Sequence, residues 1–181
     1  MLVTTSPAPV SLRLASLDDA ESIRAIYNHE VEHTVATMDL VPRTLDDQRA
    51  WLAERAGAFG ALVAVGRPGT DFEGEVVGFG ALSSFKERPA YRTTVEDSVY
   101  VRRDVNGTGI GSMLLESLLD LATNAGFHSV IARIEAGGQA SLALHARCGF
   151  ELVGVEREVG RKFNRWLDVA IMQCMLDRRR Q

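Results

Sequence analysis

A short glycine-rich segment has the residue types and the spacing needed to bind a phosphate. Glycines occupy every second position in Asn106-Gly107-Thr108-Gly109-Ile110-Gly111-Ser112, where an alternating apolar run gives way to a helix-like apolar pattern. Glycines leave backbone N–H groups uncovered, and the first N–H groups of a helix have no partner within it. A phosphate there would also meet the positive end of the helix dipole. The segment therefore predicts a phosphate cradle between a strand and a helix.

Other ligands and a purely structural role also fit such a turn. A Rossmann dinucleotide site has a third glycine where Ser112 stands and follows the first strand of a repeated parallel fold, whereas several strands precede this loop. A nucleoside triphosphate loop would carry Gly-Lys-Ser or Gly-Lys-Thr, and neither follows these glycines. The pattern alone leaves open a phosphate ligand or a tight turn between a strand and a helix.

The elements that must position this loop follow from hydrophobic periods and turn residues. Ser16 and Thr44 are capping types that mark two helix starts. The predicted elements are a strand over 10–14, helices over 17–31 and from 44 to about 57, strands over 61–65, 75–83 and 93–101, a helix over 109–125, a strand over 129–134, a helix over 139–148, and strands over 152–161 and 166–176. Consecutive strands indicate antiparallel pairs, and the strand–helix–strand passage indicates one parallel pair, so we expect a mixed sheet.

The composition indicates one domain in a reducing compartment. The chain has 181 residues, 46% of them hydrophobic, and we expect a lead-in over 1–9, a single domain over 10–177 and a basic tail over 178–181. An excess of acidic over basic residues, 24 against 20, argues against a nucleic-acid partner, and no apolar run is long enough to span a membrane. Cys148 and Cys174 form no C-x-x-C pair, so we expect no disulfide or metal site and a cytoplasmic location.

Two motifs resemble the GNAT superfamily of acyl-CoA N-acyltransferases. The pyrophosphate loop of that superfamily has the form Gln/Arg-x-x-Gly-x-Gly/Ala, and here Asn106 replaces the Gln or Arg before Gly109 and Gly111. The segment 141–150, which ends in Gly-Phe, resembles the helix after the fifth strand of the superfamily, with Gly138 where Asn is common. The resemblance implies the α/β (α+β) GNAT fold, a mixed, mostly antiparallel central sheet flanked by helices.

Longer motifs resemble the phosphinothricin and methionine sulfone/sulfoximine N-acetyltransferases over about 12–175. These motifs are Ile26-Tyr27-Asn28-His29, Phe85-Lys86-Glu87-Arg88-Pro89-Ala90-Tyr91, Val95-Glu96-Asp97-Ser98-Val99-Tyr100-Val101, Leu144-His145 and Gly160-Arg161-Lys162-Phe163-Asn164-Arg165-Trp166-Leu167-Asp168. The resemblance implies acetyl-CoA as co-substrate without a metal and a small amine, an amino acid or an analogue, as acceptor. It also implies a homodimer in which the second subunit supplies part of the substrate pocket.

The resemblance also implies which residues bind the two substrates. Those expected to bind acetyl-CoA are Val99, Tyr100, Val101, Asn106, Gly107, Thr108, Gly109, Ile110, Gly111, Ser112 and Ser141. Those expected to bind the acceptor are Lys86, Arg88, Tyr91, Asp97, Ser98 and Met38. Two cations and a phenol suit a carboxylate or phosphinate. Met38 stands where the subfamily tends to have an aromatic residue.

Glu96 has the position expected of a general base. Acetyl transfer to an amino acid needs a base, because the ammonium form of the acceptor predominates at neutral pH. Alternation over 93–101 puts Glu96, Ser98 and Tyr100 on one strand face and Val95, Asp97, Val99 and Val101 on the core face. An arbitrary strand glutamate would simply be solvated. The resemblance, however, places the catalytic glutamate of the subfamily, in the context Val-Glu-x-x-Val-Tyr-Val, at Glu96.

His145 has two possible roles. The resemblance puts it where many superfamily members have a tyrosine near the CoA sulfur, which implies that it protonates the departing thiolate or orients the acceptor. A histidine that is hydrogen-bonded within the core fits the same position equally well.

We therefore predict an acetyl-CoA-dependent N-acetyltransferase that acts on the α-amino group of a small amino acid or analogue by direct transfer. Two alternatives stay open. One is acetylation of a protein N-terminus or lysine, which the acidic balance does not exclude. The other is a CoA-binding regulatory module without turnover, which Asn106 and Gly138 would suit because they replace expected CoA contacts.

Overall fold

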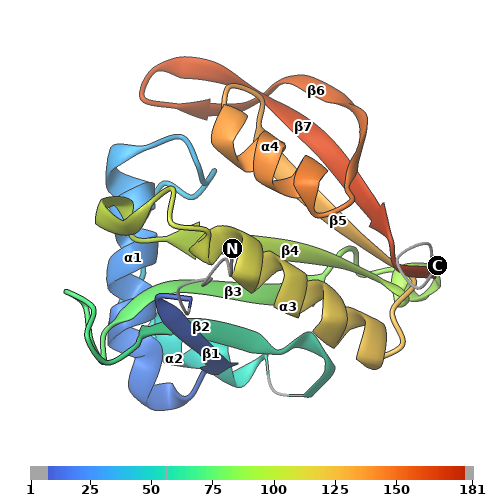
Figure 1. The fold of residues 1–181 in the computed structure, drawn as a ribbon. Helices are drawn as coiled ribbons and strands as arrows, with labels where there is room; N and C mark the ends of the chain where they lie inside the picture. The colour runs from blue at the N-terminus through green and yellow to red at the C-terminus, as the bar shows by residue number, and fades with distance from the viewer. Residues whose placement is uncertain (1–7, 56, 178–181) are drawn as a thin grey trace, which may run out of the picture.

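The computed structural model describes residues 8–55 and 57–177, which form a seven-stranded sheet with helices on both faces (Figure 1). The strands are β1 (Val10–Leu14), β2 (Ala61–Gly66), β3 (Val76–Ser84), β4 (Thr94–Val101), β5 (Ser129–Glu135), β6 (Glu151–Lys162) and β7 (Arg165–Met175). The α-helices are α1 (Ala20–His33), α2 (Leu45–Ala53), α3 (Ile110–Asn124) and α4 (Gln139–Arg147). Short 3-10 turns cover Leu17–Asp19, Gly57–Phe59, Pro89–Tyr91 and Arg103–Val105.

The sheet is mixed, as predicted. Its order is β1-β2-β3-β4-β5-β7-β6, and among these strands every neighbouring pair is antiparallel except β4 and β5, which α3 connects. Each predicted strand and helix is present within a few residues of its expected bounds. The helix predicted over 17–31 begins with a 3-10 turn instead and continues to His33.

Local capping explains where two helices begin. The Thr44 hydroxyl accepts the N–H of Asp47 at 3.1 Å, and the Asp47 carboxylate accepts the N–H of Thr44 at 3.0 Å, so α2 starts with a capping box. Helix α3 starts after Gly109 and ends before Gly126, whose φ angles are 87° and 83°. Glycine adopts this left-handed conformation without the steric cost that a side chain would add.

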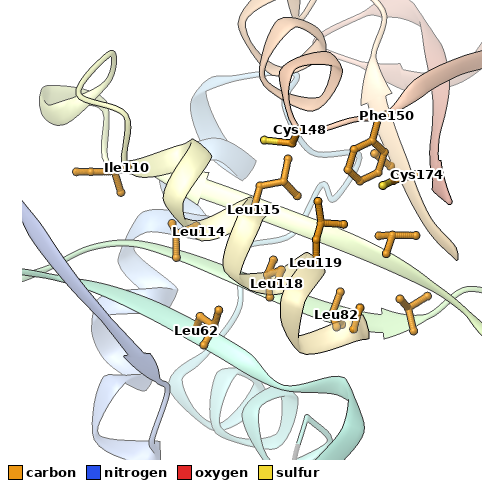
Figure 2. Close-up of a cluster of buried hydrophobic side chains, with 14 of the residues drawn as sticks. Leu62, Leu82, Ile110, Leu114, Leu115, Leu118, Leu119, Cys148, Phe150 and Cys174 are labelled. Carbon is orange, nitrogen blue, oxygen red and sulfur yellow. The ribbon is translucent and has the colours of Figure 1, made fainter. Parts of the chain in front are cut away.

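The core has two parts, one on each face of the sheet. Helix α3 places Leu114, Leu115, Leu118 and Leu119 against one face, with Phe150 beside them (Figure 2). The spacing of these leucines is that of one helix stripe, and burying each side chain contributes roughly 1.5–3 kcal/mol. Helices α1 and α2 cover the opposite face. The sheet is therefore rigidly held on both sides where β4 passes through its middle.

The hairpin of β6 and β7 is irregular. Between Glu156 and Gly160, β6 advances four residues while β7 advances two, so β6 bulges. Asp168 accepts the N–H of Glu158 at 2.8 Å within this bulge. The hairpin turn consists of Phe163 and Asn164, with φ angles of 48° and 59°, as in a type I′ turn. This bulge and turn determine where the last residues of β6 point.

Parts of the predicted lead-in and tail, residues 1–7 and 178–181, lie outside the described residues. Pro9, at the end of the lead-in, accepts a hydrogen bond from the N–H of Arg67 at 3.0 Å. In the part of the chain that the structure describes, every helix is too short or too polar to cross a membrane. Cys148 and Cys174 are both buried, and no disulfide joins them.

Candidate active site

Strands β4 and β5 separate halfway along their length. They pair at Thr94 with Ser129, at Val95 with Val130 and at Glu96 with Ile131, and the ladder ends there although β4 continues to Val101. The two strands diverge toward α4 (Figure 1). The N–H and C=O groups of β4 after Glu96 therefore pair with β3 on one side only. Two hollows occupy the separation, a cavity beside Glu96 and a groove beside residues 106–112.

The first hollow, the Glu96 cavity, has a volume of about 370 Å³. Its walls come from residues 96–100 of β4, residues 132–135 of β5, and residues 36–39 of the α1–α2 connection. Helix α4 contributes Ser141 and His145. The cavity therefore brings together side chains from parts of the chain as far apart in sequence as the α1–α2 connection and α4.

Glu96 lies where the two strands separate, and its carboxylate has no hydrogen-bond or ion-pair partner among the described residues. Burial raises the pKa of Glu96, and the negative charges of Asp97 and Glu156 raise it further, whereas the guanidinium of Arg133 opposes them. Arg133 is itself paired with Glu156 at 2.6 Å. A half-buried carboxylate of raised pKa, directed into a cavity, is suited to accept a proton.

The 36–39 segment is held by buried polar contacts. The hydroxyls of Tyr27 and Thr37 lie 3.0 Å apart, and the Tyr27 hydroxyl donates to Asp39 at 2.6 Å. Met38 follows Thr37 and lines the cavity with 39% of its surface exposed. The segment thus presents a flexible thioether to the cavity from an ordered backbone.

A buried ion pair joins β4 to α4. His145 Nε2 lies 3.1 Å from Asp97 Oδ2, and the two residues are only 4% and 6% exposed. His145 Nδ1 donates to the carbonyl of Ser141 at 2.7 Å, since a carbonyl can only accept. Asp97 Oδ1 is buried and has no hydrogen-bond partner in the part of the chain that the structure describes. His145 Nδ1 carries the proton that it donates to Ser141. A hydrogen bond between Nε2 and Asp97 therefore requires a second proton, either on Nε2 or on the carboxyl group.

The charge of His145 follows from these partners. Burial lowers the pKa of His145, but the hydrogen bond and the charge of Asp97, together with the Ser141 carbonyl, outweigh burial and raise the pKa. The imidazolium form is therefore favoured in the folded protein. Both ring nitrogens are engaged in that form.

The second hollow, the 106–112 groove, has a volume of about 480 Å³ and lies at the N-terminus of α3. Gly107 and Gly109 have φ angles of 80° and 87°, and a Cβ built at either glycine meets no atom within 4 Å from described residues beyond its chain neighbours, which leaves the backbone open. The first hydrogen bond of α3 runs from Met113 N–H to the Gly109 carbonyl at 3.1 Å. The N–H groups of the residues before Met113 lie ahead of this hydrogen-bond ladder, so they can bind an anion. The groove therefore has the open backbone and the helix N-terminus that can bind an anion.

Comparison with known proteins agrees with this geometry. Residues 12–171 match the family model described as an acetyltransferase (GNAT) domain. An L-methionine sulfoximine/L-methionine sulfone acetyltransferase of Pseudomonas aeruginosa is 42% identical over 168 residues, which are 92% of this chain and 95% of the relative. A phosphinothricin N-acetyltransferase of Streptomyces coelicolor is 40% identical over 166 residues, which are 90% of this chain and 94% of the relative. The chain belongs to the GNAT family.

A solved acetyltransferase structure is also similar along the whole fold. An acetyltransferase of Salmonella typhimurium, solved with its cofactor acetyl-CoA, has a TM-score of 0.87 and 36% identity, and the match covers 93% of this chain and 94% of that one. The predicted fold, the predicted family and the predicted enzyme class are thereby confirmed. The protein is an acetyl-CoA-dependent N-acetyltransferase of the GNAT family.

Most residues predicted to bind acetyl-CoA line the 106–112 groove. They are Val99, Tyr100, Val101, Asn106, Gly107, Gly109, Ile110, Gly111, Ser112 and Ser141. Thr108 does not line it, because its hydroxyl donates to the Val105 carbonyl at 2.7 Å. Two cations at the groove, Arg103 and Arg147, were not predicted. The basic pair Arg102-Arg103, just before the glycines, was the available sequence signal.

The residues predicted to bind the acceptor are divided between two places. Met38, Asp97 and Ser98 line the Glu96 cavity, although Asp97 is occupied by His145. Lys86, Arg88 and Tyr91 instead line a separate hollow on the β3–β4 connection, with the Lys86 ammonium 5.1 Å from the centre of the Tyr91 ring. Within one chain the structure does not bring these three side chains to Glu96.

Four further residues of the cavity were missed by sequence reasoning. Tyr27, Thr37, Asp39 and Arg133 all line it. Tyr27 belongs to the motif Ile26-Tyr27-Asn28-His29, but its helical spacing indicates only a core position. The 32–42 loop has no period, so no local signal pointed to Thr37 or Asp39.

Proposed function

We propose that this GNAT enzyme acetylates the α-amino group of a small amino acid or analogue, of the phosphinothricin, methionine sulfone or methionine sulfoximine type, with Glu96 as general base. The observation that carries the proposal is the Glu96 carboxylate at the point where β4 and β5 separate, which has no polar partner within residues 8–55 and 57–177. The named activities of the two curated relatives support the acceptor class.

Glu96 acts on the acceptor directly or through a water molecule. Its raised pKa brings the carboxylate closer to the pKa of the group it must deprotonate. A cavity of about 370 Å³ holds an amino acid but not a folded polypeptide surface. The size of the cavity supports a free amino acid over a protein N-terminus or lysine.

The groove would hold acetyl-CoA next to this cavity. Bound acetyl-CoA supplies an activated acetyl thioester. The chain supplies the open backbone of residues 99–101, which no β5 ladder covers, and the N–H groups at the start of α3 for the phosphates. Ser141 and Val99 line both hollows, so the two substrates would meet there. This adjacency supports direct transfer without an acyl-enzyme.

His145 is best assigned to orienting the site. Both of its ring nitrogens are engaged, by Asp97 and by the Ser141 carbonyl, so neither is directed at a leaving group. The pair connects α4 to β4 and fixes Ser141 between the two hollows. This arrangement favours the orienting role that the sequence left open over protonation of a thiolate.

The active enzyme is a homodimer in this proposal. Leu152, Val153 and Val155 of β6 are exposed although large and apolar, as are Phe163 and Trp166 at the hairpin turn. Exposed apolar side chains along an edge strand suit a partner surface. A second subunit would also give a place for Lys86, Arg88 and Tyr91, which one chain keeps away from Glu96.

Thiol release from acetyl-CoA with a panel of amines tests the function. The panel contains methionine sulfoximine, methionine sulfone, phosphinothricin, common amino acids, and peptides with a free N-terminus or lysine. We expect turnover with the free amino acids or analogues only. Turnover with the peptides alone would establish the protein-acetylating alternative. CoA binding by calorimetry without turnover of any amine would establish the regulatory module.

A further inference from the structure

Two residues at the end of β6 contact the 36–39 segment from outside the Glu96 cavity. Gly160 and Lys162 are more than a hundred residues away from this segment in sequence, and neither lines the cavity. The contacts are of two independent kinds, one polar and one steric. They are not needed for the proton transfer proposed above.

Lys162 binds the backbone of the segment. The residue is 3% exposed, and its ammonium donates to the carbonyl of Thr37 at 2.9 Å and to the carbonyl of Glu30 at 3.4 Å. Burial lowers the pKa of Lys162, and the carboxylates of Asp39 and Glu30 oppose this effect. Because both acceptors are backbone carbonyls, the contact fixes the position of the segment's backbone, whatever side chains the segment carries.

Gly160 contacts the side chain of Met38. A Cβ built on Gly160 would lie 2.8 Å from Met38 Sδ, closer than real side chains approach, and the next atoms are Met38 Cε at 3.7 Å and Leu167 Cβ at 3.8 Å. The missing side chain therefore makes room for Met38 alone. Met38 in turn is part of the cavity wall.

The irregular hairpin explains how β6 reaches this place. After the bulge between Glu156 and Gly160, Gly160 pairs with Leu167 and Lys162 with Arg165. Leu167 is buried beside Gly160, and Lys162, two residues after Gly160, is also buried. Gly160 and Lys162 therefore lie on the inner face of the hairpin. The bulge thus turns the last residues of β6 toward the α1–α2 connection.

We propose that Gly160 and Lys162 determine acceptor specificity by fixing Met38 and Thr37 over the Glu96 cavity. They are positioning residues, since they act through the 36–39 segment and do not touch the acceptor. The proposal rests on the proposed function, in which this cavity binds the acceptor. The ligand class is an amino acid whose side chain extends toward Met38.

A double-mutant cycle tests the steric contact. Gly160→Ala should displace Met38 toward the cavity and lower kcat/KM about tenfold for the longest acceptors, with less effect on the shortest. In the Met38→Ala background the same change should alter kcat/KM less than about twofold, because the clashing sulfur is gone. Thermal denaturation of all four proteins shows that each is folded.

The polar contact has its own test. Lys162→Met keeps the apolar stem but removes the donors, and it should raise the acceptor KM about tenfold while the acetyl-CoA KM changes less than twofold. Arg161→Met on the same strand is the matched control, because Arg161 is exposed and contacts Asn164 and Trp166 instead of the segment. This control should leave both KM values unchanged.

The possible outcomes separate the two proposals. Equal effects of Gly160→Ala in both backgrounds, or an unchanged acceptor profile in every variant, overturn the specificity role while turnover by the unmodified protein still supports the proposed function. Parallel changes in the KM values of both substrates in Lys162→Met reduce Lys162 to a general structural role. Absence of turnover by the unmodified protein overturns the proposed function and this inference with it.

Discussion

His145 Nε2 lies 3.1 Å from Asp97 Oδ2, and this contact connects the two sides of the opening between β4 and β5. Asp97 belongs to β4, one residue after the strands separate, and His145 belongs to α4, which follows β5. A buried ion pair of this kind is costly to break from one side only, because the remaining charge is left unpaired. The pair therefore fixes the width of the opening in which the proposed reaction takes place.

Removing Asp97 should change how stability depends on pH. The raised pKa of His145 means that its contribution to stability is fully present below the ordinary histidine pKa, about 6.5, and is lost as pH rises through the raised value. Asp97→Asn should cost about 3 kcal/mol at low pH and should lose this dependence on pH. Urea denaturation between about pH 5.5 and 8.5 measures both effects. Glu87→Gln, which removes an exposed carboxylate, is the control. If Asp97→Asn kept the pH dependence of the unmodified protein, the dependence would not come from the contact between Asp97 and His145.

Replacing Glu96 should remove the base. We expect Glu96→Gln to lower thiol release about 100-fold or more at every pH, because the amide cannot accept a proton. In the unmodified enzyme, activity should fall on the acid side with an apparent pKa above that of ordinary glutamate, since burial raises the pKa of Glu96. The rate profile against pH for both proteins measures this. Glu151→Gln, exposed on β6, serves as control, and unchanged thiol release in Glu96→Gln would show that another group is the base.

Substituting two glycines that have the same backbone conformation should distinguish a loss of CoA binding from backbone strain. Gly109 and Gly126 have φ angles of 87° and 83°, and among the described residues a Cβ at either would meet no atom within 4 Å beyond its chain neighbours. An alanine at either position should therefore cost a similar amount of stability, about 1 kcal/mol. Only Gly109→Ala should also weaken CoA binding, about tenfold, because Gly109 lies in the groove. Calorimetric titration and thermal denaturation measure the two effects, and equal CoA affinities would show that the cradle does not hold the phosphates.

The sequence predicted the elements and part of the site, and the rest depended on distant contacts. Alternation over β4 correctly placed Glu96 on the face opposite Val95, because side-chain period is a local property, but it did not show that a core lies on both faces. It could not show that the ladder with β5 ends at Glu96, since register is set by two strands 35 residues apart. For the same reason it did not join Asp97 to His145, 48 residues away. The contact of Lys162 with Thr37 spans 125 residues and depends on a bulge in β6 that no local pattern revealed.

Arg103 should supply the cation that Asn106 does not. Arg103 lines the groove with about half of its side chain exposed, and the buried Glu30 carboxylate holds its guanidinium in place. Arg103→Gln should weaken CoA binding about tenfold at low salt and less at high salt, because ions screen the attraction between a guanidinium and a phosphate. Arg102→Gln is the matched control, since Arg102 pairs with Glu75 and Asp104 and does not line the groove. Equal affinity losses in the two variants, with equal salt dependence, would assign the effect to net charge rather than to a contact made by Arg103.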